Sequence, residues 1–106
     1  MFGRHVTMKL KAGSAEELTR LNQNEIIPLL RKQKGFRDES LFIAPGRSEA
    51  IANSFWETRE DAEAYHRAGY TEVLKTLSKV VEGTPIVESF EFAESTANKA
   101  AAQTAK

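Results

Sequence analysis

The stretch GFRDESLFIAPGRSEAIANSFWE, residues 35–57, decides the fold. Phe36 to Ala44 and Ala50 to Trp56 are rich in aromatic and aliphatic residues that favour strands. Between them, Pro45–Gly46–Arg47–Ser48 has the composition of a tight loop. The stretch therefore predicts a β-hairpin with a loop of about four residues.

Both strands of this hairpin carry apolar residues at consecutive positions. Leu41, Phe42 and Ile43 are consecutive in the first strand, and Phe55 and Trp56 in the second. Successive side chains of a strand face opposite sides of the sheet. We therefore expect both faces of this sheet to carry apolar groups.

Toward the N-terminus, the sequence predicts a strand followed by a long helix. Residues 2–11 alternate with period two, which indicates a strand. Ser14 and Glu17 have the spacing of a capping box, so we expect the helix to begin after Ser14 and to run to about Lys34. Pro28 lies inside this helix and should kink it.

Toward the C-terminus, a second helical region precedes a last strand. Thr58 and Asp61 form a weaker capping pair, and Gly69 interrupts the helix that follows. An apolar stripe continues the helical pattern toward Gly83: Val73, Leu74, Leu77, Val80 and Val81. Residues 84–92, TPIVESFEF, predict the last strand.

The predicted order of elements is β-α-β-β-α-β. It indicates an α+β protein, a ferredoxin-like sandwich with an antiparallel sheet, over residues 1–94. Residues 95–106 are polar and Ala-rich, so we expect a flexible or weakly ordered tail. Both helical regions would cover one sheet face and leave apolar groups bare on the other. We therefore expect a homodimer that pairs through the sheet face.

Composition excludes several classes of function. Fifteen basic residues balance fifteen acidic ones, which disfavours nucleic acid as a partner. No segment is long and apolar enough to span a membrane, and the N-terminus resembles neither a signal nor a transit peptide, which favours the cytoplasm. With no Cys and two His separated by sixty intervening residues, the chain offers no metal-ligand spacing, and we expect no cofactor.

The sequence resembles the antibiotic biosynthesis monooxygenase (ABM) family of dimeric α/β-barrel proteins over about residues 2–94. The resemblance depends most on the Pro28-containing helix that leads into Gly35–Phe36, and on the run SFWETREDAEAYHRAGY at residues 54–70. It implies a homodimer whose two sheets form a barrel, with a pocket between sheet and helices. It also implies a cofactor-independent oxygenase acting on a small aromatic or quinol-like, hydrophobic ligand.

Some positions depart from branches of this family. The residues that haem-degrading members use would fall at Val6, Tyr65 and Lys75, and none matches, which disfavours haem degradation. The strand Asn of polyketide-oxidising members would fall at Ala52 rather than at Asn53. This departure weakens the monooxygenase interpretation.

Residues 54–70 hold the only Trp, both Tyr and one of the two His, and they supply most of the candidate pocket residues: Trp56, Tyr65 and Tyr70, with His66 as the candidate catalytic base. Each has an alternative interpretation. Trp56 and Tyr65 pack the core or line a pocket, and His66 is a solvated helix residue or a base. His5 and Asn53 are further pocket candidates that would otherwise lie in the dimer contact.

Two classes of function stay open at this point. The first is an enzyme, either the monooxygenase or an isomerase of a small enolisable molecule on the same scaffold. The second is a non-catalytic dimeric module that binds a small ligand or acts in a stress response. An enclosed cavity lined by aromatic residues and reached by His66 or His5 favours the enzyme. A cavity filled by Tyr65, Trp56 and Leu77 favours the module.

Overall fold

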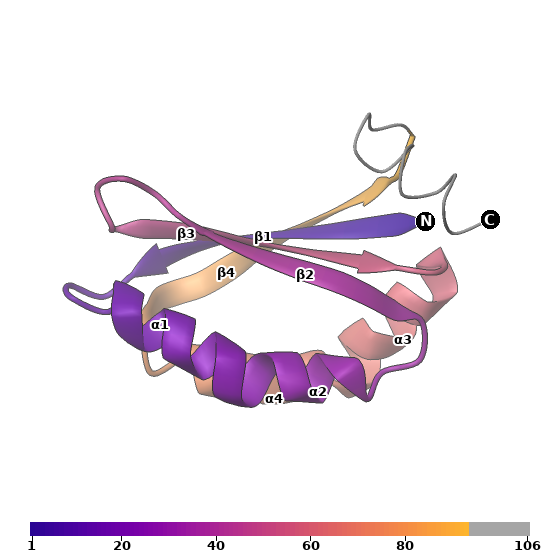
Figure 1. Ribbon diagram of the computed structural model, residues 1–106, viewed down its shortest axis with the longest axis horizontal. Coiled ribbons are helices and arrows are strands. Elements are labelled where there is room, and N and C mark those ends of the chain that lie inside the picture. The colour runs from indigo at the N-terminus through magenta and orange to yellow at the C-terminus, as the bar shows by residue number, and fades with distance from the viewer. Residues whose placement is uncertain (94–106) are drawn as a thin grey trace.

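The computed structural model describes residues 1–93, which form a four-stranded antiparallel sheet with the helices on one face (Figure 1). The sheet order is β2-β3-β1-β4. Its strands are β1 (Phe2–Leu10), β2 (Phe36–Ile43), β3 (Glu49–Trp56) and β4 (Val81–Glu91). This arrangement confirms the predicted α+β ferredoxin-like fold. The tail predicted at residues 95–106 lies outside the described residues.

The first helical region is divided by a π-helical turn. Helix α1 (Ala15–Leu21) leads into the π-helical segment η1 (Asn22–Ile26), and α2 (Ile27–Arg31) follows. Pro28 lies in the first turn of α2. Because proline has no N–H to donate, regular α-helical bonding cannot run through it, and the wider turn before it absorbs the interruption. The expected single helix to Lys34 is therefore shorter and divided.

The predicted capping box at the start of this region does not form. Ser14 occupies the N-cap position, but its side chain makes no capping hydrogen bond. Glu17 instead pairs with Arg20 one turn further along. A salt bridge within the helix thus takes the carboxylate that the box would need.

The second helical region consists of α3 (Arg59–Ala68) and α4 (Tyr70–Leu77), separated at Gly69 as predicted. The Thr58 hydroxyl accepts a hydrogen bond from the backbone N–H of Asp61 over 3.1 Å, which confirms that cap. Val80 and Val81 were expected at the end of the helix, but α4 ends at Leu77. The turn carries Val80 into the core, and Val81 pairs with Leu10 at the start of β4.

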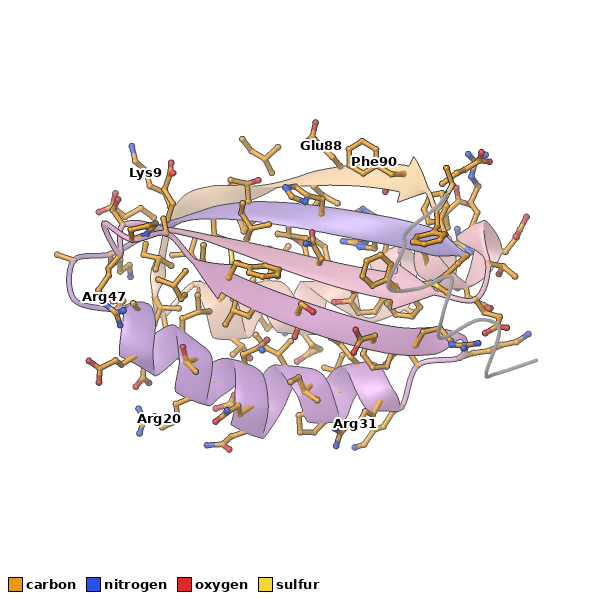
Figure 2. All side chains as sticks on the ribbon, turned by 45° about the horizontal axis from the view of Figure 1, so that its top comes forward. Lys9, Arg20, Arg31, Arg47, Glu88 and Phe90 are labelled. Carbon is orange, nitrogen blue, oxygen red and sulfur yellow. The ribbon has the colours of Figure 1, made fainter. Side chains whose placement is uncertain are left out.

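The two faces of the sheet differ in what covers them. Toward the helices, β1 presents Phe2, Val6, Met8 and Leu10, all buried. On the other face, exposed fractions reach 57% for Phe42, 64% for Ile86 and 55% for Phe90. Figure 2 shows Phe90 and Glu88 standing on the side of the sheet away from the helices. Both faces therefore carry apolar side chains, as the sequence predicts, and the single chain leaves one of them uncovered.

Helices in the described part of the chain are too short or too polar to cross a membrane.

Gly35, which links α2 to β2, provides a test of this architecture. Its φ is +80°, and a Cβ added to Gly35 would overlap the Asp61 side chain. The overlap includes the Cβ atom of Asp61, which no side-chain rotation can move away. We expect Gly35→Ala to lower the free energy of unfolding by at least about 2 kcal/mol, and the melting temperature by about 8 °C or more. Thermal unfolding followed by circular dichroism measures this change.

Two further glycines are matched controls. Gly46→Ala meets open space and has no positive φ, so its effect should stay within about 0.5 kcal/mol. Gly13→Ala also meets open space but has φ +72°, so it isolates the backbone strain of about 1–2 kcal/mol. A Gly35→Ala variant no less stable than Gly13→Ala would contradict the close approach of α3 to Gly35.

Candidate functional site

A central cavity of about 40 Å³ lies between the sheet and the helices. Most of its wall is apolar, and a smaller polar set comes from both layers: Arg4, Asn22, Glu39, Ser54, Tyr65 and Tyr70. A space of this size holds a few water molecules and is well below the roughly 300–1,000 Å³ of typical small-molecule sites. The polar set is the part of this space that chemistry can use.

Arg4 is the most unusual member of the set. Only 4% of its surface is exposed, and within residues 1–93 it forms no ion pair. Its guanidinium lies over the rings of Tyr65 and Tyr70, at 5.1 and 4.7 Å from their centroids. Nη1 lies 3.1 Å from Nδ1 of His66, whereas the buried Nη2 has no hydrogen-bond partner among the described residues. A buried cation without an anion is costly, so Arg4 has unused capacity to bind one.

The two tyrosines form the aromatic part of the cavity wall. Their rings pack edge to face at 6.1 Å. Burial raises the pKa of both hydroxyls, and the charge of Arg4 acts against it; at Tyr70 the hydrogen-bonding approach of the Arg4 side chain also lowers the pKa. The Tyr70 hydroxyl is buried and has no hydrogen-bond partner within residues 1–93. It stays protonated at neutral pH and can donate a hydrogen bond into the cavity.

Trp56 supports this wall from behind. It is fully buried, and its ring stacks on Tyr65 at 4.9 Å and meets Phe36 edge to face. Its indole N–H donates to the Ser54 hydroxyl over 3.0 Å, so no donor remains for a ligand. Trp56 therefore fixes the position of Tyr65 and is not among the residues that line the cavity.

His66 lies on the exposed side of α3, outside the central cavity. Its ring stacks on Tyr70 at 5.3 Å, and its Nδ1 accepts the hydrogen bond that Arg4 donates. An accepting Nδ1 places the proton of the neutral imidazole on Nε2. Desolvation and the Arg4 charge both lower the pKa of His66, which favours this neutral form.

His66 borders a second space, an open groove of about 500 Å³ between α3 and β4. The groove is lined by residues from both elements and from the start of β1, among them Phe2, Arg59, Ala62, Arg67 and Val87. Arg4 lines both this groove and the central cavity. The Arg4–His66 contact thus lies where the two spaces approach each other.

His5 and Asn53 lie on the opposite face of the sheet. They are cross-strand neighbours, and His5 Nδ1 donates to Asn53 Oδ1 over 2.7 Å. Phe90 meets the His5 ring edge to face, and both polar residues line a separate surface pocket of about 250 Å³. The structure therefore brings Tyr65, Tyr70 and His66 together around Arg4 and places His5 and Asn53 on the uncovered apolar face.

Glu39 and Asn22 complete the polar set at another part of the wall. Asn22 Nδ2 donates to Glu39 Oε1 over 3.2 Å. Burial raises the pKa of Glu39, the hydrogen bond from Asn22 lowers it, and the neighbouring charge of Asp38 raises it, with an upward net effect. A carboxylate whose pKa is raised by an apolar wall is suited to accept a proton.

Sequence reasoning did not select Arg4, Asn22 or Glu39, although a signal was present. Arg4 interrupts the inward apolar parity of the first strand, and Glu39 precedes the inward Leu41 by two residues. Asn22 follows the buried Leu18 by one helical turn. Each is a polar residue at a position that the apolar pattern assigns to the core.

No cluster of three or more His, Asp or Glu in the described part of the chain could hold a metal ion.

Comparison with known proteins finds one matching family model and several solved structures with the same fold. The family model described as antibiotic biosynthesis monooxygenase matches residues 1–77. A monooxygenase from the gene ActVA-Orf6 of Streptomyces coelicolor, solved with nanaomycin D, superposes with a TM-score of 0.77 at 16% identity, over 89% of this chain and 88% of that chain. No curated protein matches the sequence.

Two further solved structures share the fold. SnoaB, a cofactor-independent oxygenase from Streptomyces nogalater, gives a TM-score of 0.72 at 12% identity, over 90% of this chain and 95% of that chain. Rv0793 from Mycobacterium tuberculosis gives 0.70 at 12% identity, over 90% and 97%. At these identities the superpositions establish the fold alone.

The raised pKa of Glu39 has a consequence for stability. A carboxyl that holds its proton more tightly in the folded state makes the fold less stable as the pH rises from the unfolded pKa through the folded pKa. Glu39→Gln removes this titration and keeps an acceptor for Asn22. We therefore expect the variant to melt a few degrees above the wild type at pH 7, and the gap to close below pH 4.

Thermal melts across pH 3–8 measure this difference. Glu49→Gln, which removes an exposed carboxylate at the start of β3, is the matched control and should show no such pH-dependent gain. A Glu39→Gln variant that is less stable than the wild type at pH 7 would show that the ionised carboxylate stabilises the fold.

Proposed function

The chain belongs to the antibiotic biosynthesis monooxygenase family, and from this membership and the geometry of the central cavity we propose that it is a cofactor-independent monooxygenase of a small aromatic, quinol-like molecule. One observation carries the proposal. An apolar space between sheet and helices contains a buried cation, a buried hydroxyl donor and a carboxylate with a raised pKa. Among the proteins that share the fold, two are named as a monooxygenase and a cofactor-independent oxygenase.

Such a reaction needs little from the protein beyond a base and a shielded site. The substrate loses a proton from an activated CH₂ or its enol form to the base. The resulting anion transfers an electron to O₂, and the two radicals combine into a C–O bond. The peroxide anion takes up a proton, and loss of water leaves C=O, so that one oxygen atom enters the product and the other leaves as water. An apolar wall favours these steps by excluding bulk water.

We propose Glu39 as the proton acceptor, because it lines the cavity and its pKa is raised. The base expected from the sequence, His66, lies outside the cavity, and its Nδ1 lone pair is occupied by Arg4. His66 can act as the base only if this hydrogen bond opens. The two candidates therefore make different demands on the structure and can be separated by variants.

The small cavity favours an alternative function. About 40 Å³ of free space is too little for an aromatic ring unless the walls move. A cavity that side chains such as Tyr65 and Leu77 largely fill favours a non-catalytic ligand-binding or stress-response module. An isomerase of an enolisable molecule would use the same base without O₂. Oxygen dependence separates the monooxygenase from both.

The uncovered sheet face supports a homodimer. Its exposed apolar residues, Phe42, Ile86 and Phe90, are joined by Phe55 and the His5–Asn53 pair on the same side. Burying such a face against a second copy removes apolar surface from water in a domain of modest size. We propose that two copies pair through this face, which places His5 and Asn53 in the contact.

A substrate screen tests the enzymatic proposal. Quinols, anthrone-like ketones and dihydroxy-aromatics are incubated under ¹⁸O₂, and the products are analysed by mass spectrometry. We expect at least one compound to gain a single ¹⁸O atom. Turnover without incorporation from O₂ would favour the isomerase, and binding without turnover would favour the module.

The base is tested on any substrate found. We expect Glu39→Gln to lower kcat by about 10²–10⁴-fold, because the proton acceptor is lost. In the wild type, kcat should rise with pH through the raised pKa of Glu39, and this limb should vanish in the variant. Glu49→Gln controls for the charge change. If Glu39→Gln keeps its turnover while His66→Gln loses it together with a limb near the imidazole pKa, His66 is the base.

The dimer is tested by placing a charge on the uncovered face. We expect Phe90→Glu to shift the protein from dimer to monomer in sedimentation equilibrium at micromolar concentration, because it would bury a carboxylate in an apolar contact. Arg31→Glu, which changes an exposed position on the outer surface of the helices (Figure 2), should stay dimeric. A wild-type chain that sediments as a monomer would contradict the proposal.

A further inference from the structure

We propose that the central cavity takes its organic ligand as an anion, whose charged oxygen accepts hydrogen bonds from Arg4 Nη2 and the Tyr70 hydroxyl while the rest of the ligand lies in the α3–β4 groove. The inference rests on the proposed function, because it concerns the same cavity. It narrows the substrate class to molecules that carry an ionised oxygen, such as a phenolate or a carboxylate, in addition to the CH₂ or enol that Glu39 deprotonates.

The first argument is the balance of charge around Arg4. Only 4% of the Arg4 surface is exposed, and no carboxylate of residues 1–93 pairs with it. Aromatic faces and a neutral imidazole surround the guanidinium, and none of these carries a negative charge. The Glu39 carboxyl lines the same cavity but forms no ion pair with Arg4. A desolvated cation of this kind binds an anion more strongly than an exposed one does, because water does not screen the interaction.

The second argument is the pair of unused donors. Arg4 Nη2 and the Tyr70 hydroxyl are the buried side-chain atoms that make no hydrogen bond of normal geometry in the described part of the chain. The Arg4 side chain is nevertheless close enough to the Tyr70 hydroxyl to lower its pKa by hydrogen bonding, which places the two groups next to each other. Both residues line the same cavity, and the guanidinium carbon lies 4.7 Å from the Tyr70 ring centroid. Burying two donors without acceptors costs free energy, and one oxygen with several lone pairs would satisfy both.

The third argument is volume. The cavity of about 40 Å³ has room for a charged group but not for an aromatic ring. The groove of about 500 Å³ between α3 and β4 has room for a ring system, and its wall includes Phe2, Ala62 and Val87. Arg4 lines both spaces, so a ligand can place its charged oxygen inward and its rings in the groove.

The Arg4–His66 contact lies where the two spaces approach each other. Nδ1 of neutral His66 accepts a hydrogen bond of 3.1 Å from Nη1 of Arg4, and the imidazole itself lines the groove. An anionic oxygen is a stronger acceptor for a guanidinium than a neutral imidazole nitrogen. The ligand can therefore displace His66 from Arg4 as it enters, and His66 acts as a positioning residue that holds Arg4 until then.

Binding is tested with three probes of similar shape: 4-nitrophenol, 4-nitrobenzoate and 4-nitrobenzyl alcohol. Equilibrium dialysis at pH 8.5, where the first two are ionised, measures their dissociation constants with the full chain. We expect at least one anionic probe to bind at least about tenfold more tightly than the alcohol. A preference for the phenol indicates a phenolate ligand, and a preference for the benzoate indicates a carboxylate.

Variants locate the charge that the anion meets. Arg4→Met should reduce binding of the anionic probe to that of the alcohol, and Tyr70→Phe should weaken it several-fold. Arg31→Met removes an exposed arginine from the helical surface and should change nothing. If Arg4→Met does not fold, Arg4→Lys keeps the charge without the second buried nitrogen and should bind the anion less tightly than the wild type.

The proposal is overturned if the three probes bind equally, if no anionic probe binds, or if Arg4→Met keeps the preference for anions. It is also overturned if Arg67→Met, in the open groove, removes that preference while Arg4→Met does not. Because dialysis requires no turnover, anion binding without oxygenation would contradict the proposed function alone. Oxygenation of substrates without any preference for anions would contradict this inference alone.

Discussion

A guanidinium buried without an acidic partner is the constraint that organises the inner side of this sheet. Arg4 leaves water almost completely and gains aromatic faces in place of a carboxylate. Cation–π contacts of this kind stabilise a desolvated cation by about 2 kcal/mol, which offsets part of the burial cost. Two further aromatic side chains hold the tyrosine rings against the guanidinium: Trp56 stacks behind Tyr65, and His66 stacks behind Tyr70. The result is one continuous stack with the cation in its middle.

The break at Gly69 makes this stack possible. Tyr65 and Tyr70 are five residues apart, so in an unbroken α-helix their side chains would point about 140° apart. Both could not then face the same guanidinium. The interruption between α3 and α4 turns Tyr70 back toward Arg4. A Cβ at Gly69 would lie 2.9 Å from Cδ1 of Tyr65, so a side chain there would also push the first ring out of place.

The sequence predicted the fold better than the site because the two depend on different information. The hairpin, the Thr58 cap and the break at Gly69 follow from local patterns, and the structure confirms them. The capping box at Ser14 did not form because Arg20 competes for Glu17, a contact that the motif does not take into account. The central cavity joins Arg4, Glu39 and Tyr70, which come from separate elements and meet only through the crossing of the chain.

The polar residues of the cavity could still have been found from the sequence by searching for polar residues at inward positions. An apolar pattern is usually searched for the residues that fit it, whereas Arg4 and Glu39 are residues that interrupt it at inward positions. A charge at such a position has either a partner or a ligand, because otherwise its burial is unfavourable. For a sheet that faces helices on one side, the interruptions of the inward pattern therefore indicate the site more directly than the aromatic clusters do.

The two faces of the sheet together explain how so small a domain can carry these groups. On the inner face, Arg4, Glu39 and Ser54 replace apolar contacts that would stabilise the core. On the outer face, Phe42, Ile86 and Phe90 remain available for burial against a second copy. In the proposed dimer the outer contact supplies hydrophobic stabilisation that the inner face gives up. A chain of this length that kept its polar cavity without pairing would have to find that stabilisation elsewhere, and the apolar side chains on the inner face of its sheet are already packed in or against the core. The proposed site on one face and the proposed association on the other are therefore two consequences of the same alternation along each strand.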